Sequence, residues 1–169
     1  IRCCEAQHGI PAFSYSFEEN EKPGIFYPEK AKELGIPEGK SWQELQNGKS
    51  IQIDDRKIES SQVTGEKRPG KKIGISGDTR PTKKLEEFFE NSDYLSFDCT
   101  FSDELKDRAI ETNHSTAKEA AELAKNANVK NLILTHFSAR YNDESILLNE
   151  AKQIHESVIA AKDLLEIEI

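Results

Sequence analysis

The segment Asn131-Leu-Ile-Leu-Thr-His-Phe-Ser-Ala-Arg-Tyr141 contains the pattern that decides the fold. Residues 131–135 form a short, mainly apolar run that is typical of a strand. The polar and aromatic residues from His136 to Tyr141 follow at once. In layered folds the strands hold such loops rigidly, and binding and catalytic side chains are often found in them. The segment therefore predicts a strand of a layered sheet followed by a functional loop.

Strands alternate with helices around this segment, from Lys72 to the end of the chain. This order indicates an α/β fold in which helices pack on a sheet. The pattern predicts strands at 72–76, 94–98, 131–135, 158–160 and 165–169, and helices at 81–91, 116–127 and 145–155. We expect Ser115 or Thr116 to cap the second of these helices, and His155 to lie at the surface or boundary of the third.

The part of the chain before Lys72 has shorter elements. Aromatic residues alternate with small or polar ones at 12–18, which predicts a half-buried strand. Two short helices are expected at 29–34 and 41–46, the second with a capping box formed by Ser41 and Glu44. A hairpin is expected at 50–53 and 57–59. The Gly- and Pro-containing run 64–72 is the most basic part of the chain, and its charge alone favours a solvated linker over an RNA contact.

Composition excludes several classes of protein. The chain has 36% hydrophobic and 32% charged residues, which is typical of a soluble globular domain. A net charge of −8 argues against a protein that coats nucleic acid, since that requires a broad basic surface. No apolar run is long enough for a bilayer, so no membrane partner is expected. An odd number of cysteines, with Cys3 next to Cys4, favours a reducing, cytoplasmic location.

Four side chains of metal-ligand type lie in expected loops: His8, Asp78, His114 and His136. A single histidine or aspartate at the end of a strand is more often a helix cap or a satisfied core group than a ligand. Together, however, they comprise a carboxylate and three of the four histidines of the chain, and all four side chains lie in loops that could meet at one edge of a sheet. Imidazole and carboxylate are the mixture that zinc accepts, and a carboxylate can bridge two metals.

Four segments resemble motifs of the tRNase Z family, a branch of the metallo-β-lactamase fold: HGIPAFSY (8–15), ISGDTR (75–80), NHST (113–116) and LILTHFSARY (132–141). The resemblance implies the C-terminal half of an αββα metallo-β-lactamase sandwich at 1–21 and 68–169. It also implies an inserted, protruding tRNA-binding arm at 22–67. The function implied is that of a zinc-dependent endoribonuclease that removes the 3′ trailer of precursor tRNA, with a homodimer as the expected assembly.

The resemblance also implies a role for individual residues. His8 and His136 would each bind one of two Zn²⁺ ions, with Asp78 bridging both. His114 would protonate the leaving ribose oxygen. Asp98 stands where many relatives have Glu and would orient and charge His114 through a hydrogen bond. The residues expected to contact the substrate are Arg80, Arg140, Tyr141, Lys40, Lys67 and Arg68, although Arg140 and Tyr141 could equally hold the loop of His136.

The family's His-x-His-x-Asp-His signature does not occur in this chain. Two zinc ions with about four ligands each cannot be held by three residues. Because the chain also lacks methionine and begins with Ile1, we expect a fragment that is inactive without the missing N-terminal half of the same enzyme.

Two other functions remain open at this point. One is a non-catalytic tRNA-binding or assembly module, since the arm and the family's dimer surface need no metal. The other is a different metallo-β-lactamase hydrolase, against which the arm argues because a small substrate has no evident use for it. Cys99 is expected to be a buried, unreactive side chain, and Trp42 to anchor the two arm helices.

Overall fold

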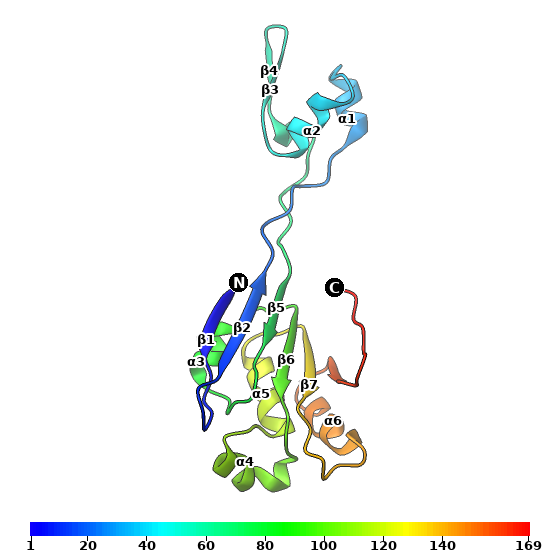
Figure 1. Ribbon diagram of the computed structural model, residues 1–169. Helices are drawn as coiled ribbons and strands as arrows, with labels where there is room; N and C mark the ends of the chain where they lie inside the picture. The colour runs from blue at the N-terminus through cyan, green and yellow to red at the C-terminus, as the bar shows by residue number, and fades with distance from the viewer. The chain divides into compact units, whose positions relative to one another are not determined.

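The computed structural model describes residues 1–169. The chain folds into two compact units (Figure 1). The first comprises Ile1–Glu18 and Lys71–Ile169, and the second Glu19–Gly70. None of the helices has the length and apolarity of a membrane span.

A six-stranded sheet forms the centre of the first unit. Its first two strands are antiparallel to their neighbours, and the other four run parallel to one another. Because the carboxyl ends of parallel strands meet at one edge, the loops that follow them are brought together there. In spatial order the strands are β1 (Arg2–Glu5), β2 (Phe13–Glu18), β5 (Lys72–Ile75), β6 (Tyr94–Asp98), β7 (Asn131–Thr135) and β8 (Val158–Ala160).

One face of this sheet is covered by helices. Leu95, Phe97, Leu132 and Leu134 alternate with more exposed residues along β6 and β7, and all four are fully buried in the same core as the inner faces of three helices. Helix α5 contributes only small side chains and one leucine to this core, so it packs closely on the sheet. The helices of this unit are α3 (Lys83–Phe88), α4 (Lys106–Thr112), α5 (Ala117–Asn126) and α6 (Ser145–Lys152), of which α3, α5 and α6 contribute most to the core.

Gly74 permits one of these close approaches. A Cβ atom at this position of β5 would lie 2.5 Å from the ring of Phe89 and 2.8 Å from the Leu95 side chain. Phe89 is fully buried. Glycine is therefore required here because the buried Phe89 ring leaves no space for a side chain, and not because of an unusual backbone angle.

The opposite face of the sheet carries an open apolar surface. Phe13, Tyr15 and Phe17 of β2 are 50%, 43% and 38% exposed, and Ile75 of β5, the register partner of Tyr15, is 42% exposed. These side chains all lie on the face away from the helices, because successive strand residues point to opposite faces. The unit is therefore one sheet covered on one side, which is the arrangement of half an αββα sandwich.

The second unit has a small core of its own. Helices α1 (Pro28–Glu33) and α2 (Lys40–Gln46) pack with the hairpin of β3 (Ile51–Ile53) and β4 (Arg56–Ile58). Trp42 anchors the helices as predicted, because its indole N–H donates to the Ile36 carbonyl at 3.0 Å and its ring lies 5.2 Å from that of Phe26.

Several element predictions were wrong. Residues 165–169 form no strand, and their Leu165 amide makes only a turn bond to Lys162. Ser41 does not cap α2: the helix begins one residue earlier, and Gly39 occupies the cap position with a φ of 105°. Helix α3 begins at Lys83 rather than at residue 81, because Thr82 occupies the cap position and accepts a hydrogen bond from the Leu85 amide.

His155 is a further correction. Helix α6 ends at Lys152, so His155 lies beyond the helix, in the turn before β8. It is only 8% exposed, and its Nε2 bonds to the Val129 carbonyl at 2.8 Å. The helical periodicity that suggested a surface position therefore does not apply to it.

Candidate active site

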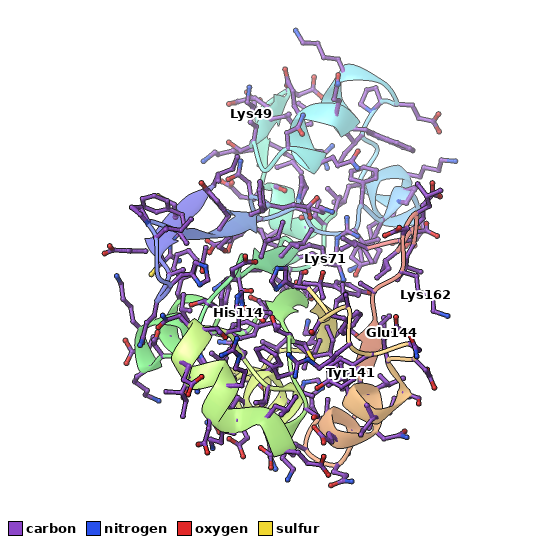
Figure 2. All side chains as sticks on the ribbon, turned by 60° about the horizontal axis from the view of Figure 1, so that its bottom comes forward. Lys49, Lys71, His114, Tyr141, Glu144 and Lys162 are labelled. Atoms are coloured by element: carbon purple, nitrogen blue, oxygen red, sulfur yellow. The ribbon has the colours of Figure 1, made fainter.

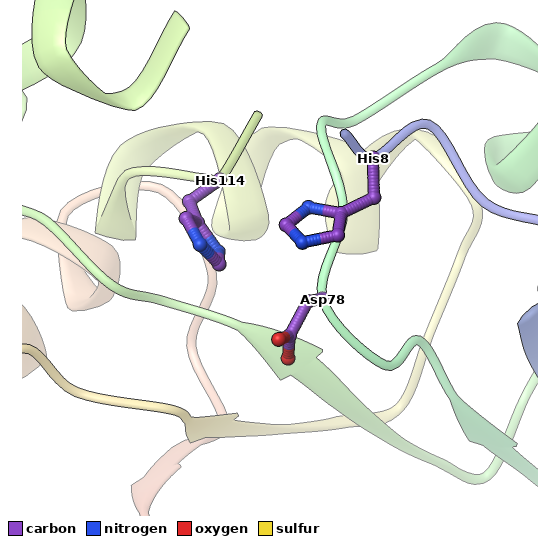
Figure 3. A group of neighbouring side chains, drawn as sticks. All are labelled: His8, Asp78 and His114. Atoms are coloured by element: carbon purple, nitrogen blue, oxygen red, sulfur yellow. The ribbon is translucent and has the colours of Figure 1, made fainter. Parts of the chain in front are cut away.

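The four metal-ligand side chains predicted from the sequence lie together at one edge of the sheet. His8 comes from the loop between β1 and β2, Asp78 follows β5, His136 follows β7, and His114 precedes α5. Figure 3 shows His8, Asp78 and His114 pointing toward a common space. Possible ligand atoms of these three residues all lie within 4.8 Å of one another.

His136 belongs to the same cluster. Its Nε2 lies 3.5 Å from Asp78 Oδ2, and its ring stacks on that of His114 with 4.9 Å between centroids. The ring of His8 lies 4.9 Å from that of His114 on another side. His114 is therefore the central imidazole of three.

Backbone contacts fix the orientation of His8. Its Nδ1 lies 3.0 Å from the carbonyl oxygen of Asn113. A carbonyl only accepts, so Nδ1 carries the hydrogen, and the neutral ring presents the lone pair of Nε2. Asn113 ends α4 in the left-handed conformation, with a φ of 59°, which is a common way for an asparagine to end a helix.

Asp98 is the buried centre of the site. Its side chain is completely inaccessible, and it accepts hydrogen bonds from the backbone amides of Thr79 at 3.0 Å, Thr100 at 3.0 Å and Ser115 at 3.4 Å. A buried carboxylate needs such donors to offset its loss of hydration. Asp98 Oδ2 also bonds to Nδ1 of His114 at 2.7 Å, so the short side chain of aspartate reaches the histidine.

A threonine connects the same carboxylate to a second histidine. The hydroxyl of Thr100 lies 2.8 Å from Asp98 Oδ1 and 2.9 Å from Nδ1 of His136. His136 has a φ of 64°, a backbone conformation that non-glycine residues adopt at a cost and that clusters at functional sites.

Arg80 is engaged inside the protein. Its guanidinium forms a two-pronged ion pair with Glu119 and also donates to the His114 carbonyl at 2.5 Å. The Arg80 and Glu119 side chains are 12% and 7% exposed. Glu119 also accepts from the amide of Thr116, the predicted cap of α5, in a capping box. The Arg80–Glu119 pair thus connects the loop after β5 to the first turn of α5. The bond from Arg80 to the His114 carbonyl also holds the main chain of His114 in place.

Arg140 and Tyr141 both make contacts that hold the loop of His136. The Tyr141 hydroxyl accepts from the Ser102 amide at 2.8 Å. Arg140 donates to Ser138 Oγ at 3.0 Å, and its guanidinium lies 4.9 Å from the centre of the Phe101 ring. These contacts favour the second of the two roles that the sequence left open.

Next to His136 is a pocket of about 650 Å³ between the loop that follows β7 and the residues after β8. Tyr141, Glu144 and Lys162 are on its walls (Figure 2).

Three more basic residues expected to contact the substrate, Lys40, Lys67 and Arg68, all lie in the second unit. Lys40 has 88% of its side chain exposed. Lys67 pairs with Glu21 at 3.2 Å, and Arg68 donates to the Pro23 carbonyl at 3.2 Å.

Cys99 is excluded as a nucleophile by its surroundings. It is fully buried, and burial raises the pKa of its thiol, with the nearby negative charges of Asp98 and Glu150 adding to the effect.

Thr100 and Glu119 are two residues of the site that were not predicted from the sequence. The signal for Glu119 was present, because Thr116 and Glu119 have the spacing of a capping box. No comparable local signal marks Thr100, whose partner His136 is distant in the sequence.

Comparisons with known proteins show which family this chain resembles. A family model described as beta-lactamase superfamily domain matches residues 24–137. The ribonuclease Z of Nitrosopumilus maritimus is 67% identical over 169 residues, which are 100% of this chain and 56% of the relative. The ribonuclease Z of Archaeoglobus fulgidus is 50% identical over 96% of this chain and 54% of its own length. The chain thus spans about half the length of the curated relatives it matches.

Solved structures agree at the level of the fold. The short form of human tRNase Z superimposes with a TM-score of 0.56 at 24% identity, over 99% of this chain and 42% of that one. The metallo-beta-lactamase fold protein YhfI of Bacillus subtilis gives 0.57 at 15% identity, over 94% and 44%. The fold and the resemblance predicted from the four segments are confirmed, and the chain belongs to the beta-lactamase superfamily.

Proposed function

We propose that this chain is the C-terminal half of a ribonuclease Z that cuts the 3′ trailer from precursor tRNA. The observation that carries the proposal is the meeting of three imidazoles and two carboxylates at one sheet edge, with Asp98 holding one imidazole and Asp78 facing another. The similarity to ribonucleases Z over the whole chain supports the same reaction.

The residues present fit a pair of zinc ions in part. His8, Asp78 and His136 would hold them, because imidazole nitrogen and carboxylate oxygen are zinc ligands. His8 has its Nδ1 on a carbonyl, which leaves Nε2 for a metal. When bound, such ions make a water acidic and stabilise charge on a phosphodiester. The remaining ligands would come from the other half of the enzyme, so the isolated chain is inactive.

His114 is the proposed proton donor. Asp98 accepts from its Nδ1, which directs Nε2 toward the cluster. A proton on Nε2 can pass to the ribose oxygen that leaves phosphorus, and the buried carboxylate carries the charge opposite to that of the protonated ring. Arg80 keeps the main chain of His114 in place. Asp98 is thus a positioning residue and His114 the catalytic acid.

The open face of the sheet supports the assignment of a half enzyme. An apolar surface that includes Phe13, Tyr15 and Ile75 requires a covering layer. We propose that a second sheet, supplied by the missing half, packs there. A homodimer and a cytoplasmic location belong to the same proposal, the latter supported by three free cysteines.

The second unit is the proposed tRNA-binding arm. It has its own core and exposed lysines such as Lys40, so it can present positive charge without disturbing the first unit. A second candidate function is a non-catalytic tRNA-binding module. The observation that favours it is that this chain supplies too few ligands for two zinc ions.

A cleavage assay with the complete polypeptide tests the proposal. We expect a precursor tRNA to be cut at the start of its 3′ trailer, the activity to disappear with a chelator, and zinc to restore it. Binding of precursor tRNA without cleavage would instead indicate the non-catalytic module. Hydrolysis of small esters without any effect on precursor tRNA would indicate a different hydrolase.

A further inference from the structure

We propose that Thr100 is a positioning residue that fixes the tautomer of His136, so that the two oxygens of one buried carboxylate, Asp98, orient both the proton donor and a metal-binding histidine. This inference rests on the proposed function, since it assigns His136 to a metal.

The direction of each hydrogen bond follows from the donors around Asp98. The amides of Thr79, Thr100 and Ser115 are donors only, and all three point at this carboxylate. The carboxylate therefore accepts on both oxygens. The single hydroxyl hydrogen of Thr100 lies on its 2.8 Å bond to Asp98 Oδ1.

That assignment determines the state of His136. Because its hydrogen is used toward Asp98, the Thr100 hydroxyl offers only a lone pair to His136 Nδ1 at 2.9 Å. Nδ1 must then carry the ring hydrogen. The lone pair of a neutral His136 is on Nε2, the atom that lies 3.5 Å from Asp78. This is the form of histidine that binds a metal, with its other nitrogen fixed by a neighbouring group.

Thr100 also holds the main chain of the same loop. Its carbonyl accepts from the amide of Ser138 at 3.2 Å, two residues beyond His136. The side chain of His136 is 45% exposed, its ring stacks on that of His114, and its Nε2 lies 3.5 Å from Asp78 Oδ2. Stacking does not distinguish the two tautomers, and the 2.9 Å bond to the Thr100 hydroxyl is stronger than a 3.5 Å contact with Asp78. The hydroxyl is therefore the contact that sets the tautomer.

Substitution of Thr100 tests the inference in the complete polypeptide. Thr100→Val removes only the hydroxyl function at nearly constant volume, and Asp98 keeps its three amide donors. Thr100→Ser is the matched control because it retains the hydroxyl. Histidine labelled with ¹⁵N reports the tautomer of His136 in the metal-free protein, and competition with a chelator reports zinc affinity.

We expect wild type and Thr100→Ser to have the hydrogen of His136 on Nδ1. Thr100→Val should give a mixture of tautomers and bind zinc about 10-fold to 100-fold more weakly. Wild-type tautomer and affinity in Thr100→Val would overturn the inference. So would equal losses in both variants, since they would indicate packing instead of the hydroxyl.

The same measurements distinguish a failure of this inference from a failure of the proposed function. If wild type has the expected tautomer and binds zinc but leaves precursor tRNA uncut, the proposed function fails and the role of Thr100 stands. If wild type cuts precursor tRNA with the hydrogen of His136 on Nε2, the function stands and the inference fails.

Discussion

At the scale of single residues, His114 has the most constrained surroundings of the cluster. Its Nδ1 is held by Asp98 and its carbonyl by Arg80, and its ring lies between those of His8 and His136. If it is the acid, His114→Ala in the complete enzyme should lower the single-turnover rate by about 10² to 10⁴. Bound zinc should stay constant, because the proposed ligands are untouched. Zinc loss measured on the same preparation would make His114 a ligand instead.

Asp98→Asn tests whether the carboxylate of Asp98 contributes to the reaction through His114. The amide can no longer hold a protonated imidazole with a negative charge, and we expect a smaller loss of rate with unchanged zinc content. A rate equal to that of wild type would remove Asp98 from the mechanism. The melting temperature of each variant separates a loss of chemistry from a loss of fold.

Asp93 makes a prediction about acid stability. Burial opposes its ionisation, but bonds from Lys130 at 2.7 Å and from the Lys72 amide at 2.8 Å, with the charge of Lys71, outweigh burial and hold the pKa of Asp93 below its ordinary value. A lowered folded pKa contributes stability above the unfolded pKa of about 3.9, and this contribution is lost as the pH falls through the folded pKa.

We therefore expect Asp93→Asn to destabilise the complete polypeptide by about 1–3 kcal/mol at pH 7. The difference from wild type should shrink as the pH falls below about 4. Thermal unfolding of both proteins over this range measures it. A difference that is independent of pH would mean that the charge of Asp93 does not contribute.

At the scale of elements, the sequence predicted what local chemistry determines. The limits of β6, β7 and β8 match the structure, because their apolar runs are bounded by polar residues. The sequence indicated Ser115 or Thr116 as the cap of α5, and the structure has Thr116 in that position. Strand β1 and helix α4 were missed, and α4 buries only Ala109 and so has no apolar periodicity. The alternation at 165–169 predicted a strand, but a strand also needs a partner edge, which local sequence does not encode.

Glu119 links the cap of α5 to the site, and its charge can be tested. Glu119→Gln keeps the shape of the side chain but leaves the guanidinium of Arg80 in a buried position without its counter-charge. Breaking a buried pair in this way costs about 3 kcal/mol. The matched control is Glu111→Gln, which breaks the exposed pair with Arg108 and should change stability by less than about 1 kcal/mol. Denaturant unfolding of both variants measures the contrast, and equal effects would contradict it.

At the scale of the whole molecule, the histidines of the site were predictable because each adjoins an element that the sequence shows. His136 follows a strand, His8 precedes a strand, and His114 precedes a helix. The contacts that orient them were not. Thr100 meets His136, and Arg80 meets His114, only after the strands have paired, and no spacing in the sequence encodes either contact. The open sheet face is a similar case. The alternation of Phe13, Tyr15 and Phe17 predicted a half-buried strand, but these residues do not encode what packs on their exposed side.

The incomplete ligand set predicts how the isolated chain behaves. In this chain only His8, Asp78 and His136 are proposed as ligands of the two zinc ions, and each ion needs about four ligands. We expect at most one weakly bound zinc in the isolated chain and no cleavage of precursor tRNA. Calorimetric titration with zinc measures this, and two tight sites would refute it.

The division into two units leads to the last prediction. Residues 22–67 lie within the unit Glu19–Gly70, which has its own core, whereas His8, Asp78, His114 and His136 all belong to the other unit. Replacing 22–67 by a short flexible linker in the complete enzyme should therefore weaken the binding of precursor tRNA while a small phosphodiester is still hydrolysed. Equal losses on both substrates would argue against an arm that serves only to bind tRNA.

The salt dependence of tRNA binding shows whether the arm binds through contacts between its positive charges and the phosphates. Removing the charge that neutralises one phosphate lowers the slope of log affinity against log salt by about 1. Lys40→Ala removes one exposed charge without breaking a close ion pair, because the nearest partner of Lys40, Glu44, is 3.9 Å away. A lower slope for Lys40→Ala, and a larger decrease for the deletion, would show that the arm binds through phosphates. An unchanged slope in both would mean that the charges contacting tRNA lie on the unit that carries the active site.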